Sequence, residues 1–273
     1  MTRTIDGNSL RGVSATTLWT LRNRAEEAKR PAPIIDDPLA VELYETIDYD
    51  YEKFGKPSQS HALRALAADA AARDHLARHP GASVVNLGEG LQTSFWRVAD
   101  PKVAWISVDL APVMEVRREL LPREEQIVEC PTSALDRAWF DEVPDDQPVL
   151  IIAEGLFMYF EPDEVWALLT DLAARFPGGS LFFDSIPSWF SKKTVSPNGL
   201  HLTDRYRTPP MPFSLNIVGA AAIPKRIPAI TRVDDVPMPR GRGPWGNALL
   251  MSFADAPVLK NLRPSISLAH FAE

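Results

Sequence analysis

The chain has 273 residues, a formal net charge of −7 at pH 7 and an apolar fraction of 45%. This length and composition provide enough apolar material for one large domain with a cap, or for two small domains. The negative charge disfavours wide contact with a phosphate backbone, although Arg240 and Arg242 form a local basic patch, so we expect no nucleic-acid partner. The N-terminal residues lack a signal-peptide core and no segment approaches the length of a membrane span, which predicts a cytoplasmic protein without a membrane partner.

The single cysteine, Cys130, excludes an intrachain disulfide and a thiolate metal cluster. One buried thiol is more often a core residue than a nucleophile. The histidines show neither the HExxH pattern nor another metal-ligand spacing, so we expect no metal site. They are His61, His75, His79, His201 and His270.

Three helices are predicted ahead of the first strand. Apolar residues recur at helical spacing within residues 14–29, and further helices are expected over residues 39–46 and over the alanine-rich residues 60–78. A bare dinucleotide-binding domain tends to start with its glycine-bearing strand. Residues 1–80 are therefore predicted to form a helical cover over a cofactor.

A strand, glycine turn, helix and strand follow this cover. The apolar strand Val84–Leu87 ends at Gly88 and Gly90, where the backbone can turn sharply and approach a ligand without a Cβ in the way. Leu91–Val98 is expected to be helical, and Val103–Val108 is a second apolar strand. This order is typical of a nucleotide-binding βαβ unit.

The alternation of strands and helices continues to residue 186 and predicts a doubly wound α/β sheet. Helices are expected over residues 113–121 and 162–176, and strands over residues 126–130, 149–153 and 180–184. The run at 149–153 is wholly apolar, as expected for a central parallel strand. We assign residues 81–186 to this α/β core.

The amino-acid composition changes after residue 186. Residues 187–244 are dense in proline and basic residues, and only residues 217–223 look regular, so this segment is predicted to be a cap or lid inserted after the fifth strand. Residues 245–273 are expected to complete the core sheet. Strand-like residues 230–236 and 266–271, with a helix around residues 247–253 between them, would supply its antiparallel edge.

The chemistry of the strand ends distinguishes two classes of cofactor. The third glycine of the dinucleotide fingerprint is absent, and Thr93 would obstruct the close approach of a helix to a pyrophosphate, which disfavours NAD. Asp109 ends the second strand, where a carboxylate can accept hydrogen bonds from two ribose hydroxyls, and Glu154 ends the fourth. S-adenosylmethionine (SAM) fits better, because it has no phosphates and offers an amino acid, a sulfonium and a ribose.

Four ordered motifs and a leader resemble the leucine carboxyl methyltransferase family, in particular its bacterial branch of polyketide (tetracenomycin-type) O-methyltransferases. The resemblance covers about residues 14–190. It implies a class I SAM-dependent methyltransferase with a Rossmann-like, mostly parallel sheet of seven strands, SAM as methyl donor and a small-molecule acceptor. The matching runs are residues 84–91, 108–113, 133–139 and 152–160, with residues 24–38 in the leader.

The resemblance also implies roles for residues at the first strands. Arg64 matches the helical arginine that pairs with the cofactor carboxylate, the alternative being a solvated helix charge. Gly88 and Gly90 match the cofactor turn, while Asp109 and the adjacent Leu110 match the ribose-binding end of the second strand.

Further matches lie at the later strands. Ala134 and Leu135 match the pair beside the adenine, although Leu135 is almost as well explained as a core residue. Glu154 matches the acid near the cofactor amino group, and a carboxylate directly after five apolar residues is costly without a partner. Tyr159 is the candidate catalytic residue facing the methyl-transfer point, with core packing as the equal alternative.

The sequence departs from the family pattern close to the glycine turn. The family commonly has Asp and Arg where this chain has Gln92 and Ser94, and Glu89 replaces a small residue. Either Glu89 takes over from the missing aspartate at the cofactor amino group, or the affinity is lower. A catalytically weakened module that binds SAM or S-adenosylhomocysteine (SAH) is therefore the alternative function, and an NAD-dependent oxidoreductase a weaker third.

The implied reaction is in-line SN2 transfer of the methyl group from the sulfonium to an acceptor oxygen. A carboxylate is ionised at neutral pH and needs no general base, whereas a phenol does, so we expect carboxyl methylation ahead of phenol methylation. His201 is a candidate base, with a solvent-facing loop histidine as the alternative. Arg205 and Arg207 are candidates for binding an acidic acceptor, with simple surface charge as the alternative.

Overall fold

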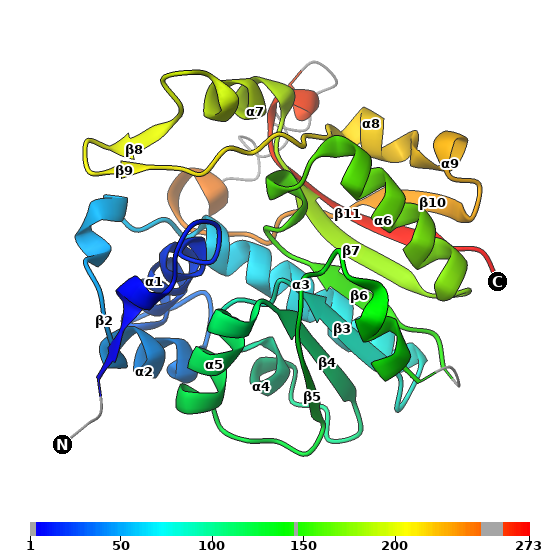
Figure 1. The fold of residues 1–273 in the computed structure, drawn as a ribbon, viewed down its shortest axis with the longest axis horizontal. Helices are drawn as coiled ribbons and strands as arrows, with labels where there is room; N and C mark the ends of the chain where they lie inside the picture. Colours follow the sequence, from blue (N-terminus) through cyan, green and yellow to red (C-terminus); the bar gives the residue numbers. More distant parts are fainter. Residues whose placement is uncertain (1–3, 145–146, 247–258) are drawn as a thin grey trace.

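The computed structural model describes residues 4–144, 147–246 and 259–273. Its central element is a seven-stranded sheet in the order β10-β11-β7-β6-β3-β4-β5 (Figure 1). Five strands are parallel, and β10 and β11 form an antiparallel edge, which confirms the predicted fold class. The strands are β3 Ser83–Leu87, β4 Ala104–Asp109, β5 Ile127–Pro131, β6 Leu150–Ala153, β7 Ser180–Ser185, β10 Ile230–Asp235 and β11 Ser265–Phe271.

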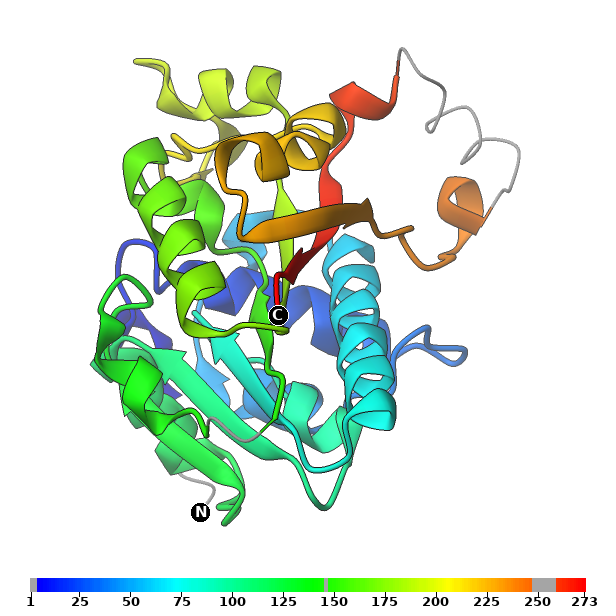
Figure 2. The same ribbon diagram turned by 90° about the vertical axis from the view of Figure 1, so that its right-hand side faces the viewer.

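Both faces of the sheet are covered, which explains the continuous apolar runs in its strands. Val85 packs into a core under helix α6 (Pro162–Arg175), whereas its neighbour Val84 packs on the opposite face under helix α3 (Ser60–Arg78). Figure 2 shows the two helices on opposite sides of the sheet. Successive residues of β3 point to opposite faces of the sheet. Because both faces are covered, every residue of this strand is buried and the strand has no polar face.

The strand order reverses between β3 and β6. The chain runs outward from β3 to β4 and β5, then returns to pair β6 with the other side of β3. In open α/β sheets ligands bind at such a reversal, outside the carboxyl ends of the strands. Gly88 and Glu154 follow β3 and β6 at this point.

The helix after β3 is shorter than predicted. Helix α4 spans Ser94–Val98, so the expected start at Leu91 is wrong. Residues 88–93 form a turn instead, because their backbone groups bond to side chains from other elements. The next helix, α5, spans Ala111–Leu120 and agrees with its prediction within two residues.

The leader forms the three predicted helices, α1 (Thr16–Ala28), α2 (Pro38–Thr46) and α3. Helices α1 and α2 pack together and against α5, while α3 lies along the sheet. Within the described parts of the chain, no helix has the length and apolarity that a bilayer crossing needs. We propose that residues up to about 80 act as a cover, since they lie beside the strand ends (Figure 1).

The segment between β7 and β10 is more regular than predicted. It contains α7 (Ser188–Val195), the hairpin of β8 (His201–Thr203) and β9 (Tyr206–Arg207), and the short helices α8 (Ile217–Ala221) and α9 (Ile223–Arg226). Prolines were a poor guide here, because Pro187 precedes α7 and Pro224 lies in the first turn of α9, where proline is tolerated. Since β10 belongs to the sheet, we propose that the cap ends near residue 229 rather than 244. The helix expected at residues 247–253 lies outside the described residues.

A buried ion network joins the leader to the turn after β3. Arg24 of α1 is fully buried and donates to the Asp37 carboxylate at 2.6 Å and to the Leu91 carbonyl at 2.5 Å. Arg97 of α4 donates to the same Asp37 oxygen at 2.8 Å and to Asp69 of α3 at 2.7 Å. Burial opposes ionisation of Asp37, but the charges of Arg24 and Arg97 hold its pKa below the usual value. Two guanidiniums and two carboxylates thus compensate one another away from water.

Replacing Asp37 with Ala should lower the free energy of unfolding by about 3–5 kcal/mol, because two guanidiniums would remain buried without this partner. Urea denaturation measures this loss. The control is Asp50→Ala, which breaks the exposed ion pair with Arg205 and should change stability little. Equal effects of the two substitutions would contradict the proposed dependence on burial.

Candidate active site

The turn after β3 requires glycine at two positions. Gly88 and Gly90 have φ angles of 60° and 59°, a left-handed conformation that other residues rarely adopt. A Cβ on Gly88 would lie 2.6 Å from a methyl carbon of Leu156, and one on Gly90 would collide with the Thr17 hydroxyl. The prediction that the backbone turns sharply at these two glycines is confirmed.

Side chains from three elements brace this turn. The Gly90 N–H donates to Asp109 of β4 at 2.6 Å, and the Leu91 N–H donates to the Thr17 hydroxyl of α1 at 2.6 Å. Arg117 of α5 donates to the carbonyls of Gly90 and Gln92, each at 2.8 Å. These hydrogen bonds hold the turn in shape through groups of the protein itself, which lowers the ordering cost of binding.

Glu89 is a structural residue of this turn. Its buried carboxylate pairs with Arg117 at 2.9 Å and accepts hydrogen bonds from Trp105, at 3.1 Å, and from the Ser107 hydroxyl. Burial raises its pKa, and the Arg117 charge opposes the shift. The idea that Glu89 replaces the family's aspartate at the cofactor amino group is not supported, because its carboxylate is held inside the domain. We propose instead that Glu89 contacts the cofactor through its backbone, at the cavity wall.

Neighbouring groups compensate for the other two departures from the family pattern, Gln92 and Ser94. Gln92 donates to Glu154 Oε1 at 2.9 Å, so a neutral amide satisfies that carboxylate. Arg97 donates to the Ser94 hydroxyl at 2.9 Å. A guanidinium is thus present beside Ser94, supplied from one helical turn further along the chain. The spacing of three residues between Ser94 and Arg97 was the available sequence signal.

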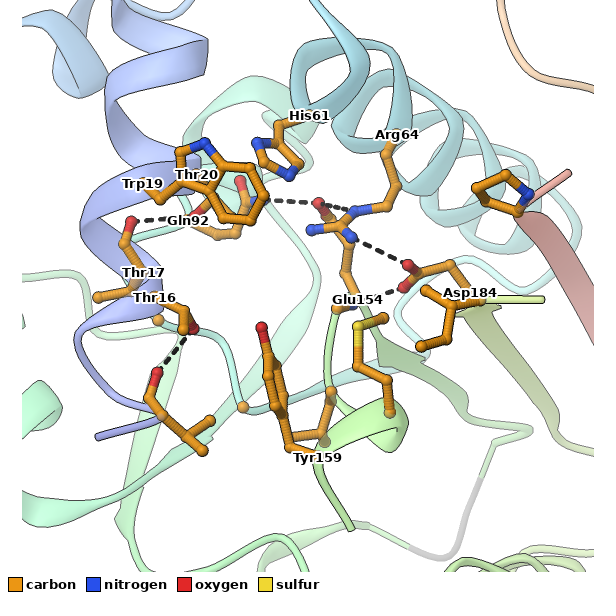
Figure 3. A pocket seen from close by; sticks show the side chains of 18 of the residues that line it. Thr16, Thr17, Trp19, Thr20, His61, Arg64, Gln92, Glu154, Tyr159 and Asp184 are labelled. Atoms are coloured by element: carbon orange, nitrogen blue, oxygen red, sulfur yellow. Dashed lines mark hydrogen bonds and ion pairs between the residues drawn. The ribbon is translucent and has the colours of Figure 1, made fainter. Parts of the chain in front are cut away.

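Arg64 connects two carboxylates at the ends of β6 and β7 (Figure 3). Its Nε donates to Glu154 at 2.9 Å and its Nη1 donates to Asp184 at 2.9 Å. Only 13% of the Arg64 side chain is exposed, so the alternative of a solvated helix charge is wrong. Asp184 was missed by the sequence analysis, although it follows the same pattern of an acid near the end of a strand.

The electrostatics of this cluster favour a cationic ligand. Burial raises the pKa of Glu154, and the charge of Arg64 opposes this shift. Burial also raises the pKa of Asp109, whose carboxylate faces the same cavity. The carboxylates of Asp109, Glu154 and Asp184 thus lie at the strand ends together with the guanidinium of Arg64, while Arg240 and Arg263 also line the cavity.

Apolar side chains line the cavity at two places. Leu110, Val113 and Ala134 line one end beside Asp109. Leu135 packs against the core and is not among the residues lining the cavity, which favours its explanation as a core residue. At the other place lies an apolar cluster of Met158, Ile186, Phe190 and Met211, from the segment after β6, the residue after β7 and the cap.

Tyr159 lies between these ends, in the short helix η4 (Phe157–Tyr159), and projects into the cavity (Figure 3). Burial raises the pKa of its phenol, and an interaction with Thr16 opposes the shift in part. The cavity has a volume of about 850 Å³, within the usual range for small-molecule sites. No group of metal-ligating side chains was found in the part of the chain that the structure describes.

Three residues proposed for acceptor chemistry do not line this cavity. His201 is exposed on β8, and Arg205 pairs with Asp50 on the surface. Arg207 contacts the carbonyl of Pro197. The roles suggested for these three side chains are therefore wrong, because the hairpin that carries them packs on residues 51–54 through Tyr206 rather than over the strand ends. The sequence missed Trp19, His61 and Arg263, which do line the cavity.

The strand order, the glycine turn and the acids at the strand ends define a class I SAM-dependent methyltransferase. A family model described as leucine carboxyl methyltransferase matches residues 17–173. The chain belongs to this family, and its cofactor is SAM. The match includes α1 to α6 and ends before the cap.

Two curated relatives are similar to this chain in sequence, and one solved structure is similar to it in fold. The tetracenomycin polyketide synthesis O-methyltransferase TcmP of Streptomyces glaucescens is 34% identical over 184 residues, covering 66% of this chain and 68% of that protein. The SAM-dependent methyltransferase dpfgK of Gibberella zeae is 28% identical over 200 residues, covering 65% and 67%. The CurJ carbon methyltransferase structure has a TM-score of 0.53 at 14% identity, covering 95% of this chain and 68% of that one, and supports the fold alone.

Replacing Gly90 with Ala should weaken SAH binding by about tenfold or more, since the added Cβ collides with Thr17 and distorts the turn. The matched control is Gly81→Ala, at a φ of 84° with no neighbouring atom within 4 Å. It carries similar backbone strain but lies outside the cavity. Calorimetric titration with SAH should separate the two variants, and equal losses would show that strain alone is responsible.

Proposed function

We propose that this enzyme transfers the methyl group of SAM by in-line SN2 displacement to a carboxylate of an aromatic, polyketide-like acid. The observation that carries the proposal is one continuous cavity, acidic at the strand ends and apolar beneath the cap. Such a cavity fits a cationic cofactor at one end and the hydrophobic body of an acceptor at the other. The relative TcmP, named as an O-methyltransferase of polyketide synthesis, supports this acceptor class.

The charge of the cofactor supports its orientation. SAM carries a sulfonium and an ammonium against one carboxylate, so its net positive charge complements the acidic wall. We propose that Glu154 accepts from the ammonium group and that Arg64 binds the carboxylate. Gly88 and Gly90 would allow the ligand to approach the backbone closely.

The nucleoside would then lie along β4 and β5. We propose that Asp109 accepts hydrogen bonds from the ribose hydroxyls, because each of its oxygens has one backbone donor and retains lone-pair capacity. Leu110 and Ala134 would enclose the adenine. A dinucleotide fits poorly, since its diphosphate would face the acidic wall instead of the N-terminus of a long helix.

The acceptor would occupy the apolar end. Met158, Met211 and Phe190 offer a wall that adapts to a fused-ring substrate, because methionine side chains are flexible and polarisable. We propose that Tyr159 orients the acceptor as a neutral hydrogen-bond donor, since its raised pKa keeps the phenol protonated at neutral pH. The main work of the site is then alignment of the nucleophile and exclusion of water.

The first test is calorimetric titration with SAH, with NAD as the control, followed by methyl transfer from SAM to naphthoate and to the matched naphthol. SAH alone should bind, and the acid should be methylated faster than the phenol. Asp109→Asn should weaken SAH binding by about tenfold or more, because an amide replaces a charged acceptor. Preference for naphthol would contradict the carboxyl assignment. Bound SAH without transfer to any acid or phenol would favour a catalytically weakened binding module.

Cofactor binding should weaken as the pH falls. The ammonium of SAH is attracted by ionised Glu154, so protonation of this carboxylate removes the attraction. Because burial raises the pKa of Glu154, the loss of affinity on lowering the pH should already begin above about pH 4.3, which is the usual pKa of glutamate. Titrations from about pH 7 to about pH 5 should show a steeper loss for the wild type than for Glu154→Gln. Parallel pH profiles would place the ammonium elsewhere.

A further inference from the structure

His61 of α3 has a fixed hydrogen-bonding partner that determines where its proton lies. Asn23 of α1 is oriented by the Ser58 N–H, which donates to Asn23 Oδ1 at 3.1 Å. The amide nitrogen of Asn23 therefore faces His61 Nδ1, at 2.7 Å. An amide NH₂ group is a donor only, so His61 Nδ1 accepts this hydrogen bond. A neutral ring that accepts at Nδ1 carries its hydrogen at Nε2.

The surroundings of His61 keep the ring neutral and in place. Burial lowers its pKa well below the usual value, and the charges of Arg64 and Arg24 act in the same direction. The charge of Glu154, an acid of the same cluster, is engaged by Arg64 and Gln92. The indole of Trp19 packs edge-on against the imidazole, with ring centroids 4.9 Å apart. The ring is thus a rigid neutral donor.

The free edge of this ring faces the cavity (Figure 3). Among the described residues, no hydrogen bond to His61 Nε2 is formed. Arg64 follows one turn later on the same side of α3 and also lines the cavity. Two neighbouring N–H donors, one neutral and one charged, are therefore presented to the same space.

We propose that His61 donates its Nε2–H to a carboxylate bound in the cavity and does not act as a general base. This inference rests on the proposed methyltransferase function and deepens it. A neutral donor suits this wall, because it binds one carboxylate oxygen without adding charge beside Arg64. The carboxylate belongs either to the methionyl end of the cofactor or to the acceptor. In the second case one oxygen is held while the other attacks the methyl group, which a phenol, having one oxygen, cannot imitate.

The first experiment measures the protonation of His61 directly. Side-chain nitrogen chemical shifts of isotopically labelled histidines distinguish the two neutral forms and the cation, and His61→Gln assigns the signal. We expect the Nε2–H form to persist unchanged between about pH 6 and about pH 8. Titration of His61 within this range, or an Nδ1–H form, would overturn the proposal. This measurement uses the ligand-free wild type and does not depend on whether methyl transfer occurs.

The second experiment identifies which carboxylate is bound. His61→Phe removes the donor, whereas His61→Gln retains an N–H near the position of Nε2 and should rescue the loss. Weaker SAH binding, by about tenfold, would assign the cofactor carboxylate, and a raised KM for naphthoate with unchanged SAH binding would assign the acceptor. Unchanged SAH affinity and KM in His61→Phe would refute the role. Absence of SAH binding by the wild type would instead refute the proposed function.

Discussion

The turn after β3 depends on a charge balance buried between the leader and the sheet. Asp37 precedes α2, yet its carboxylate holds two guanidiniums that contact the turn after β3 and the helix that follows it. The cost of removing these charges from water is offset only when all partners are present, so leader and turn are expected to order together. The leader is therefore a structural part of the cavity wall, and its removal would leave Arg97 without its partners Asp37 and Asp69.

The sequence predicted those parts of the fold that local pattern controls. Apolar runs of strand length, the two glycines and Asp109 lie within about thirty residues of one another, and a βαβ unit of this size is built from local contacts. The three leader helices were also predicted, because their apolar spacing and boundary prolines are local signals. Arg64 and Glu154 were each identified through the family resemblance, and the structure shows that they form an ion pair across 90 positions.

Long-range pairing explains what the sequence did not predict. Glu89 had the appearance of a ligand-facing acid until Arg117, on the next helix but one, was found to hold it. Asp184 and His61 gain their significance from partners on other elements, and no spacing rule connects Asn23 with His61. The regular secondary structure of the cap was underestimated, because proline marks the start of its helices as well as breaks between them.

The leader and the core strands both contribute to the site, and this limits how such enzymes can diversify. The family model spans residues 17–173, which include Thr17, Arg24 and Arg64 of the leader together with the first four strands of the core. These parts depend on one another structurally, because exchanging the leader alone would separate buried charges from their partners. Phe190 and Met211 of the cap line the apolar part of the cavity, and none of the described residues after β7 belongs to the Asp37 network. Under the function proposed above, recombination there would change the acceptor while the methyl donor stays the same.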